Sequence, residues 1–165
     1  MKEFLRVLAL ISSIVVLAAC VPFWDSWTGG GSGSSTPKAP KTESRWSVTL
    51  KTKNESVPMT VIVAPESSSK TRLLVLSSFG AAMGDCTLSA SSTCRTAPGA
   101  QPMVEKVAAA VTGMLVRDAD FVQNTVNSSV RLSDTDWKAT RDSSGNISFQ
   151  WTTAPTWSLA FKRVD

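Results

Sequence analysis

The stretch PMVEKVAAAVTGML, residues 102–115, decides how the rest of this chain can fold. Its apolar residues recur at the spacing i, i+3, i+4, i+7 and i+11, which predicts one face of a helix: Val104, Val107, Ala108, Val111 and Leu115. Met103 and Met114 widen that stripe, and Pro102 suits a first helical turn. We expect this helix to end between Met114 and Phe121 and to pack its valine face against other elements.

Segments in which apolar and polar residues alternate lie before and after this helix in the sequence. Before it, apolar patterns predict strands near residues 46–51, 59–63, 72–76 and 86–88, with a polar loop at 65–69 and a turn at 79–84. After it, we expect strands near 130–132, 137–141, 147–151 and 157–161, with a hairpin loop at 142–146. Four strands, one helix and about four strands predict an α+β domain that is mainly β, a curved antiparallel sheet or half-open barrel with the helix packed in its concave face.

The N-terminus predicts export. Lys2 and Arg6 start an apolar run that ends in Leu17-Ala18-Ala19-Cys20, and this pattern is typical of a secretory signal peptide over residues 1–19. A cysteine after two small residues is a lipobox, so we expect cleavage before Cys20 and covalent acyl chains on it. A transmembrane anchor is the alternative, but the run is shorter than the roughly 20 residues that a bilayer needs. An ordinary secreted chain is a second alternative.

Residues 20–44 are expected to form the lipidated cysteine and a linker, and residues 45–165 the folded domain. The linker is rich in glycine and serine, and a flexible chain of this size reaches about 25 Å. Phe23, Trp24 and Trp27 either rest at the membrane interface or dock on the domain. Val21 follows the cysteine, where an aspartate tends to retain such proteins in the inner membrane, so we expect an outer-membrane anchor facing the periplasm.

Composition excludes several functions. The chain has no histidine, which excludes the usual serine–histidine and cysteine–histidine hydrolases. The seventeen lysines and arginines are scattered, which argues against a nucleic-acid partner. The acid pairs Asp118/Asp120 and Asp134/Asp136 lack the pattern of a calcium loop. We therefore expect no enzyme, no metal site and no cofactor beyond the acyl chains on Cys20.

Two cysteines remain if Cys20 carries lipid. Cys86 and Cys94 are an even pair in an exported chain, which predicts a disulfide that staples the end of a strand to the loop that follows it. Closing so short a loop contributes about 2–3 kcal/mol. A redox role is the alternative, although the spacing is not C-x-x-C, and metal binding by two thiols is disfavoured.

Residues 72–80, RLLVLSSFG, and Cys86-Thr87-Leu88 resemble a hairpin of the LolB-type outer-membrane lipoproteins, which share the LolA/LolB-like domain. In that family a strand that begins with arginine runs into a turn similar to Ser-Pro-Leu-Gly, and here Ser78 and Phe79 take the proline and leucine positions. The order of lipobox, strands, helix and tryptophan-bearing strands is also similar. The resemblance implies a distant relative of the outer-membrane lipoprotein receptor, a half-open barrel that accepts or carries acyl chains.

Two functions fit these features. In the first, the sheet and helix enclose an apolar cleft that binds an acyl chain or an apolar protein segment, in lipoprotein or lipid trafficking. Its expected lining is Leu74, Leu76, Phe79, Val107, Val111, Leu115, Trp137, Trp151 and Trp157. In the second, these side chains fill the core, and the protein is a non-catalytic accessory lipoprotein that contacts another protein in an envelope complex. A hollow of several hundred cubic ångströms would favour the first function, and a packed interior the second.

Overall fold

The structure, a computed structural model, describes residues 36–123 and 129–164. The chain divides into two units, residues 1–33 and 34–165, and the description that follows concerns the second. The predicted signal peptide, Cys20 and the aromatic residues Phe23, Trp24 and Trp27 lie outside the described residues. Among the described residues, no helix is both long enough and apolar enough to cross a bilayer.

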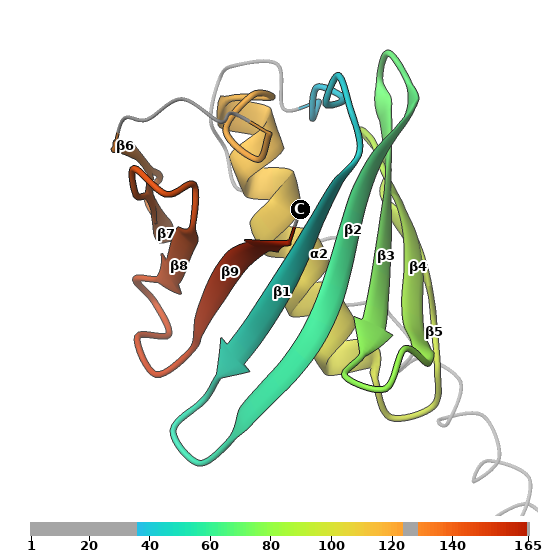
Figure 1. Ribbon diagram of the computed structural model, residues 1–165, viewed down its shortest axis with the longest axis vertical. Coiled ribbons are helices and arrows are strands. Elements are labelled where there is room, and N and C mark those ends of the chain that lie inside the picture. The colour runs from blue at the N-terminus through green and yellow to red at the C-terminus, as the bar shows by residue number, and fades with distance from the viewer. Residues whose placement is uncertain (1–35, 124–128, 165) are drawn as a thin grey trace, which may run out of the picture. The chain divides into compact units, whose positions relative to one another are not determined.

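The described strands form one antiparallel sheet in the order β5-β4-β3-β2-β1-β9-β8-β7-β6. The first five strands are β1 (Ser44–Lys51), β2 (Ser56–Ser67), β3 (Lys70–Ser77), β4 (Ala82–Leu88) and β5 (Thr93–Thr96). The helix α2 (Gln101–Arg117) follows, and then β6 (Val130–Ser133), β7 (Trp137–Arg141), β8 (Ile147–Trp151) and β9 (Ser158–Val164). Figure 1 shows the strands curving around one side, where α2 lies. The predicted fold class is confirmed.

The sheet has an inner and an outer face because its strands alternate. In β1, Trp46, Val48 and Leu50 are buried, whereas Arg45 and Lys51 are exposed. The same period of two continues in β7 and β8, where every second residue is buried. The inner residues of all these strands join the helix in one hydrophobic core.

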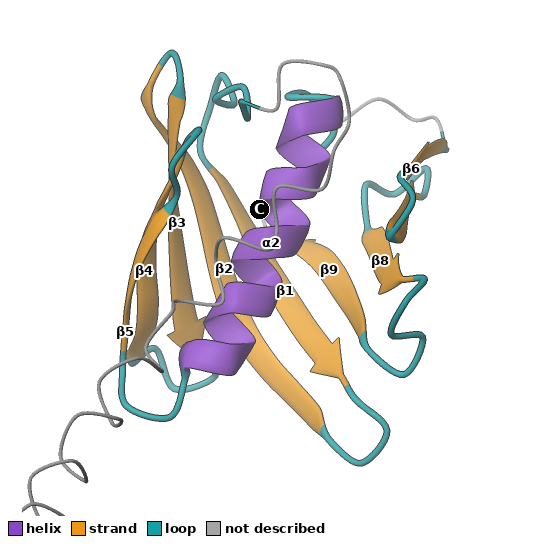
Figure 2. Cartoon of the chain, turned by 180° about the vertical axis from the view of Figure 1, so that it is seen from behind, coloured by secondary structure: helices purple, strands orange, loops and turns teal. Residues whose placement is uncertain are grey.

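The helix α2 lies across the concave face of the sheet (Figure 2). Its buried residues include every member of the predicted stripe, and they are Val104, Val107, Ala108, Ala110, Val111, Met114 and Leu115. A fully buried valine or leucine side chain contributes about 1.5–3 kcal/mol, so this face holds the helix on the sheet. Pro102 lies in the first turn, and the helix ends at Arg117, within the predicted interval.

The segment that precedes β1 is packed on the domain, which differs from the expected boundary at Arg45. We call residues 36–43 the N-terminal strap. Pro37 and Pro40 are buried, and the backbone N–H of Lys41 donates to Gln123 Oε1 at 2.7 Å. The Gln123 amide in turn donates to Thr42. Two buried prolines and these bonds tie the strap to the turn that follows α2, so the domain begins before residue 45.

The cysteine pair joins two strands rather than a strand and a loop. Cys86 and Cys94 form a disulfide and lie directly opposite each other on β4 and β5. Alternation did not predict β5 because it has only four residues, Thr93–Thr96, and none is apolar except the cysteine. The loop expected at 65–69 is also shorter, because β2 continues to Ser67 and β3 begins at Lys70.

Candidate functional site

The concave face, where a cleft was expected, is occupied by aromatic side chains and α2. The rings of Trp137 and Phe149 stack with centroids 5.2 Å apart, and Trp151 meets Phe149 edge-on at 4.8 Å. Gly113 allows the helix to approach this cluster, because a Cβ there would stand 3.2 Å from the Trp137 ring. The helix and the sheet therefore touch where an acyl chain would have to lie.

The nine residues expected to line one cleft do not lie together: six belong to the core or its edge, two point to the outer face of the sheet and one lies in a turn. Five of them are buried between α2 and the sheet: Val107, Val111, Leu115, Trp137 and Trp151. Trp157 is half-buried at the edge of the core, where Lys106 Nζ lies 5.5 Å from its ring centroid and 5.1 Å from that of Trp151. Leu74, Leu76 and Phe79 do not join them.

Leu74 and Leu76 point to the outer face of the sheet. They alternate with Leu73 and Val75, which are fully buried on the inner face. Both leucines are half-buried, and neither packs against the core. Phe79 lies in the β3–β4 turn with 96% of its surface exposed. The continuous apolar run at 72–76 predicted a strand but could not show that its two faces meet different surroundings.

A buried arginine fixes the turn that follows α2. Arg141 is only 2% exposed and lies over the Phe121 ring, with its guanidinium carbon 5.3 Å from the centroid. Its Nη1 donates to the Phe121 carbonyl at 2.9 Å, while its Nε finds no hydrogen-bond partner among the described residues. Arg163 Nη1 donates to the Gln123 carbonyl at 3.0 Å. Both arginines thus hold backbone carbonyls of the same turn against the sheet.

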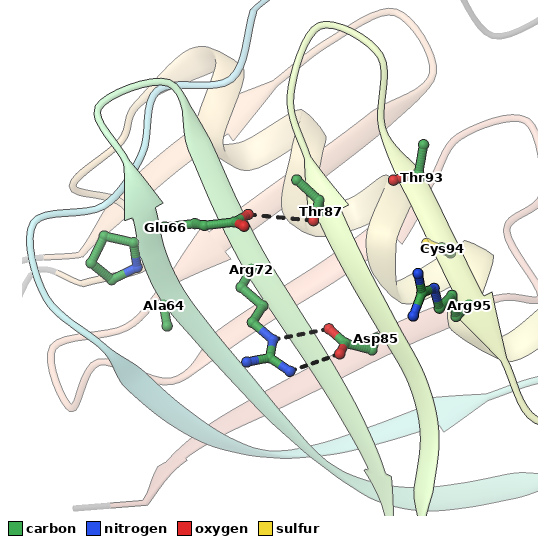
Figure 3. Close-up of a pocket in the computed structure, with 9 residues that line it drawn as sticks. Ala64, Glu66, Arg72, Asp85, Thr87, Thr93, Cys94 and Arg95 are labelled. Carbon is green, nitrogen blue, oxygen red and sulfur yellow. Dashed lines mark hydrogen bonds and ion pairs between the residues drawn. The ribbon is translucent and has the colours of Figure 1, made fainter.

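A polar groove of about 680 Å³ lies on the outer face of the sheet, across β2 to β5. We call it the convex groove, and Figure 3 shows its lining: Ala64, Pro65, Glu66, Arg72, Asp85, Thr87, Thr93, Cys94 and Arg95. Arg72 donates to Asp85 through two parallel bonds, from Nε at 3.0 Å and from Nη2 at 2.7 Å. Above this pair, Thr87 Oγ1 donates to Glu66 at 3.3 Å.

The charges of the convex groove are largely satisfied among themselves. Hydrogen bonding from Arg72 holds the pKa of Asp85 below its ordinary value of 3.8, and the charge of nearby Arg95 acts in the same direction. Asp85 is therefore ionised near neutral pH and is a poor general base there. Arg95 makes no ion pair with any described residue, so it is the cation of the groove that a ligand could meet.

Among the described residues, neither face of the sheet offers a group of side chains suited to metal binding. Within residues 36–123 and 129–164, no group of three histidine, cysteine, aspartate or glutamate side chains could hold a metal ion. The carboxylates of the paired acids accept hydrogen bonds from nearby groups instead. Asp134 accepts from Arg117 at 2.6 Å, and Asp118 Oδ1 accepts from the backbone N–H of Asp120 at 2.9 Å.

Sequence reasoning missed the Arg72–Asp85 pair and the role of Arg141. The pair depends on the register of β3 and β4, and a bulge between Val75 and Leu76 shifts that register. No local pattern shows such a bulge. Arg141 could have been found, because the alternation of Trp137 and Ala139 places it on the buried face of β7.

Comparison with known proteins finds no match to a protein-family model and no relative among curated proteins.

Proposed function

We propose that this protein is a lipid-anchored, non-catalytic accessory protein of the bacterial envelope, which acts by binding another protein through its outer surface. The proposal keeps the predicted lipobox at Cys20 and selects the accessory role from the two functions that the sequence allows. One observation supports this choice: the concave face is filled by α2 and an aromatic cluster rather than left open.

The packing of α2 disfavours carriage of an acyl chain. Val107, Val111 and Leu115 are fully buried, and burial of each such side chain is worth about 1.5–3 kcal/mol. A lipid in the concave face would have to displace the helix and replace those contacts. Protein–protein contact needs no such displacement, because the convex face and the β3–β4 turn are already accessible.

The test of this function is native mass spectrometry on the full chain, extracted from its own envelope in detergent. We expect the mass of the chain from Cys20 onward plus its covalent acyl groups, and no further lipid. A stoichiometric lipid that survives mild activation would overturn the accessory role in favour of carriage. The substitution Cys20→Ser is the matched control, because it removes the anchor and should release a chain that lacks the covalent acyl mass.

A further inference from the structure

Five neighbouring strands of the sheet carry exposed positive charge and no negative charge. The strands β1, β9, β8, β7 and β6 follow one another in the sheet order, and their sequences contain no aspartate or glutamate. Their exposed cations are Arg45, Lys51, Arg131, Lys138 and Lys162. Each cation alternates along its strand with side chains that are buried or packed against the core, so all five lie on the outer face. We call this surface the basic face.

The register of the strands brings these cations together from distant parts of the sequence. Figure 1 views the sheet from this outer side, with α2 behind it. Arg45 and Lys162 are diagonal neighbours on β1 and β9, because Arg45 pairs with Val164. Arg131 and Lys138 are diagonal neighbours on β6 and β7 in the same way. Side chains in such positions are separated by roughly 7–8 Å, close enough for like charges to repel. The basic face therefore favours a partner that brings negative charge to it.

No described residue forms an ion pair with any of the five cations. The ion pairs among the described residues involve other side chains. Glu43 lines a small hollow with Arg45 at the start of β1, but no ion pair joins the two. On β2 to β5, by contrast, Arg72 is paired with Asp85. The positive charge of the basic face is therefore available to a partner outside the described chain.

The other side chains of the basic face disfavour a protein or a nucleic acid as that partner. Serine, threonine and glutamine stand between the cations, and of the described residues on this face only Val164 is a large apolar side chain exposed to water, at 42%. Protein interfaces normally have an apolar centre, and single-stranded nucleic acids stack on exposed aromatic rings. The described part of the basic face supplies neither of these features.

An anionic bilayer fits what the basic face does offer, which is charge alone. Attraction to anionic headgroups requires no matching shape, and it acts across about 10 Å of water at about 0.1 M salt. Cations on the curved flanks of the face therefore contribute together with those that touch the headgroups. Each lysine or arginine held near such a surface strengthens binding about fivefold.

We infer that the basic face lies against anionic lipid headgroups, so that the domain rests on a membrane by the outer side of β1, β9, β8, β7 and β6. This inference goes beyond the proposed accessory function, because it concerns a second surface and leaves the convex groove on β2 to β5 for the partner protein. The acyl chains proposed at Cys20 hold the chain at the membrane, and the basic face determines which side of the domain meets the headgroups.

Lysine footprinting of the full chain on vesicles tests this contact without any substitution. The chain is added from detergent to preformed vesicles of phosphatidylcholine, alone or mixed with phosphatidylglycerol, and its exposed amines are then acetylated by a water-soluble reagent. We expect phosphatidylglycerol to slow the modification of Lys51, Lys138 and Lys162 by about threefold or more. Modification of Lys38 and Lys70, which are exposed outside the basic face, should not change. Salt at about 1 M should remove the protection.

The footprint and the flotation of the vesicles together separate the basic face from the proposed anchor. Equal modification of the two sets of lysines, or protection on phosphatidylcholine alone, would overturn the basic face. A chain that floats with both kinds of vesicle without protection contradicts the face only. A chain that floats with anionic vesicles only, and is protected there, supports the face and contradicts the acyl anchor, whereas a chain that floats with neither overturns both. Protection in the native envelope but not on anionic vesicles would indicate an acidic protein and overturn the inference.

Two triple variants of the full chain then test the position of the charge against its amount. The first removes cations of the basic face: Arg45→Gln, Lys138→Gln and Lys162→Gln. The control removes the same net charge from exposed cations elsewhere: Lys38→Gln, Lys70→Gln and Arg95→Gln. We expect Lys51 to lose its protection on anionic vesicles in the first variant and to keep it in the control, with the unfolding midpoints of both close to the wild-type value because all six side chains are exposed. Equal protection of Lys51 in the two variants would overturn the inference.

Discussion

Gly84 of β4 lies directly beneath Val104 of α2. A Cβ built on Gly84 would stand 2.5 Å from Val104 Cγ1 and 2.7 Å from Cγ2. Both residues are buried, so neither the strand at Gly84 nor the Val104 side chain can move into water to relieve such a contact. The absence of a side chain at Gly84 is what allows the first turns of α2 to approach the sheet this closely.

The first prediction follows from this contact. Gly84→Ala should lower the free energy of unfolding by about 1–3 kcal/mol, because the added methyl group forces Val104 off its position in a packed core. Gly113→Ala is the matched control. Its Cβ would meet the Trp137 ring at 3.2 Å, but alanine also favours the helix by about 1 kcal/mol, so we expect a change within about 1 kcal/mol of zero. Urea denaturation gives the free energy of unfolding of each variant relative to the wild type. A Gly84→Ala variant as stable as Gly113→Ala would contradict the close approach at Gly84.

The second prediction concerns Arg141, which holds the Phe121 carbonyl. Arg141→Met keeps much of the side-chain volume but leaves that buried carbonyl without its donor, which costs about 1–3 kcal/mol. We expect lower stability and faster hydrogen exchange at the amides of residues 119–123, while the amides of β1 keep their relative protection. A variant as stable as the wild type, with unchanged exchange in that turn, would show that Arg141 does not fix it.

The third prediction is a dependence of stability on pH. Arg72 holds the pKa of Asp85 below 3.8, so the pair stabilises the fold fully above that pH and loses its effect as the pH falls through the lowered value. The side chains of Arg72 and Asp85 are 57% and 43% exposed, so solvent screening keeps the contribution of the pair small.

The measurement compares the unfolding free energy of Asp85→Asn with that of the wild type from neutral pH down through the lowered pKa of Asp85. We expect the difference in unfolding free energy to be constant between about pH 5 and 7 and to shrink below about pH 4. Asp136→Asn, at an exposed carboxylate that forms no ion pair among the described residues, is the control and should show no such change. A difference that grows on acidification would contradict the assigned direction of the pKa shift.

The sequence predicted those elements whose pattern is local. The stripe from Val104 to Leu115 predicted α2, and the alternation from Trp137 to Arg141 predicted β7 with the bounds that the structure has. Each signal arises because one face of the element is buried and the other meets water. Strand β5 gave no such signal, because it is a short polar edge strand held by the Cys86–Cys94 disulfide.

The candidate site was less predictable, because it depends on contacts between distant residues. Leu74 and Trp137 are both large and apolar, and nothing local shows that they occupy opposite faces of the sheet. The pairing of Arg72 with Asp85 requires the bulged register of β3 and β4. The docking of the N-terminal strap depends on Gln123, eighty-one residues away from Thr42. Such relationships follow from topology and register, which a single sequence does not specify.

The fixed position of α2 is the claim on which the proposed function depends, and hydrogen exchange tests it directly. The amides of Val107, Ala108 and Val111 would be followed in the full chain with and without an excess of a palmitoylated peptide. We expect their exchange to remain slow and unchanged, because the helix stays packed on the concave face. Faster exchange of these amides when the peptide is added would show that the helix lifts to admit an acyl chain, and would contradict an accessory protein that acts through its outer surface.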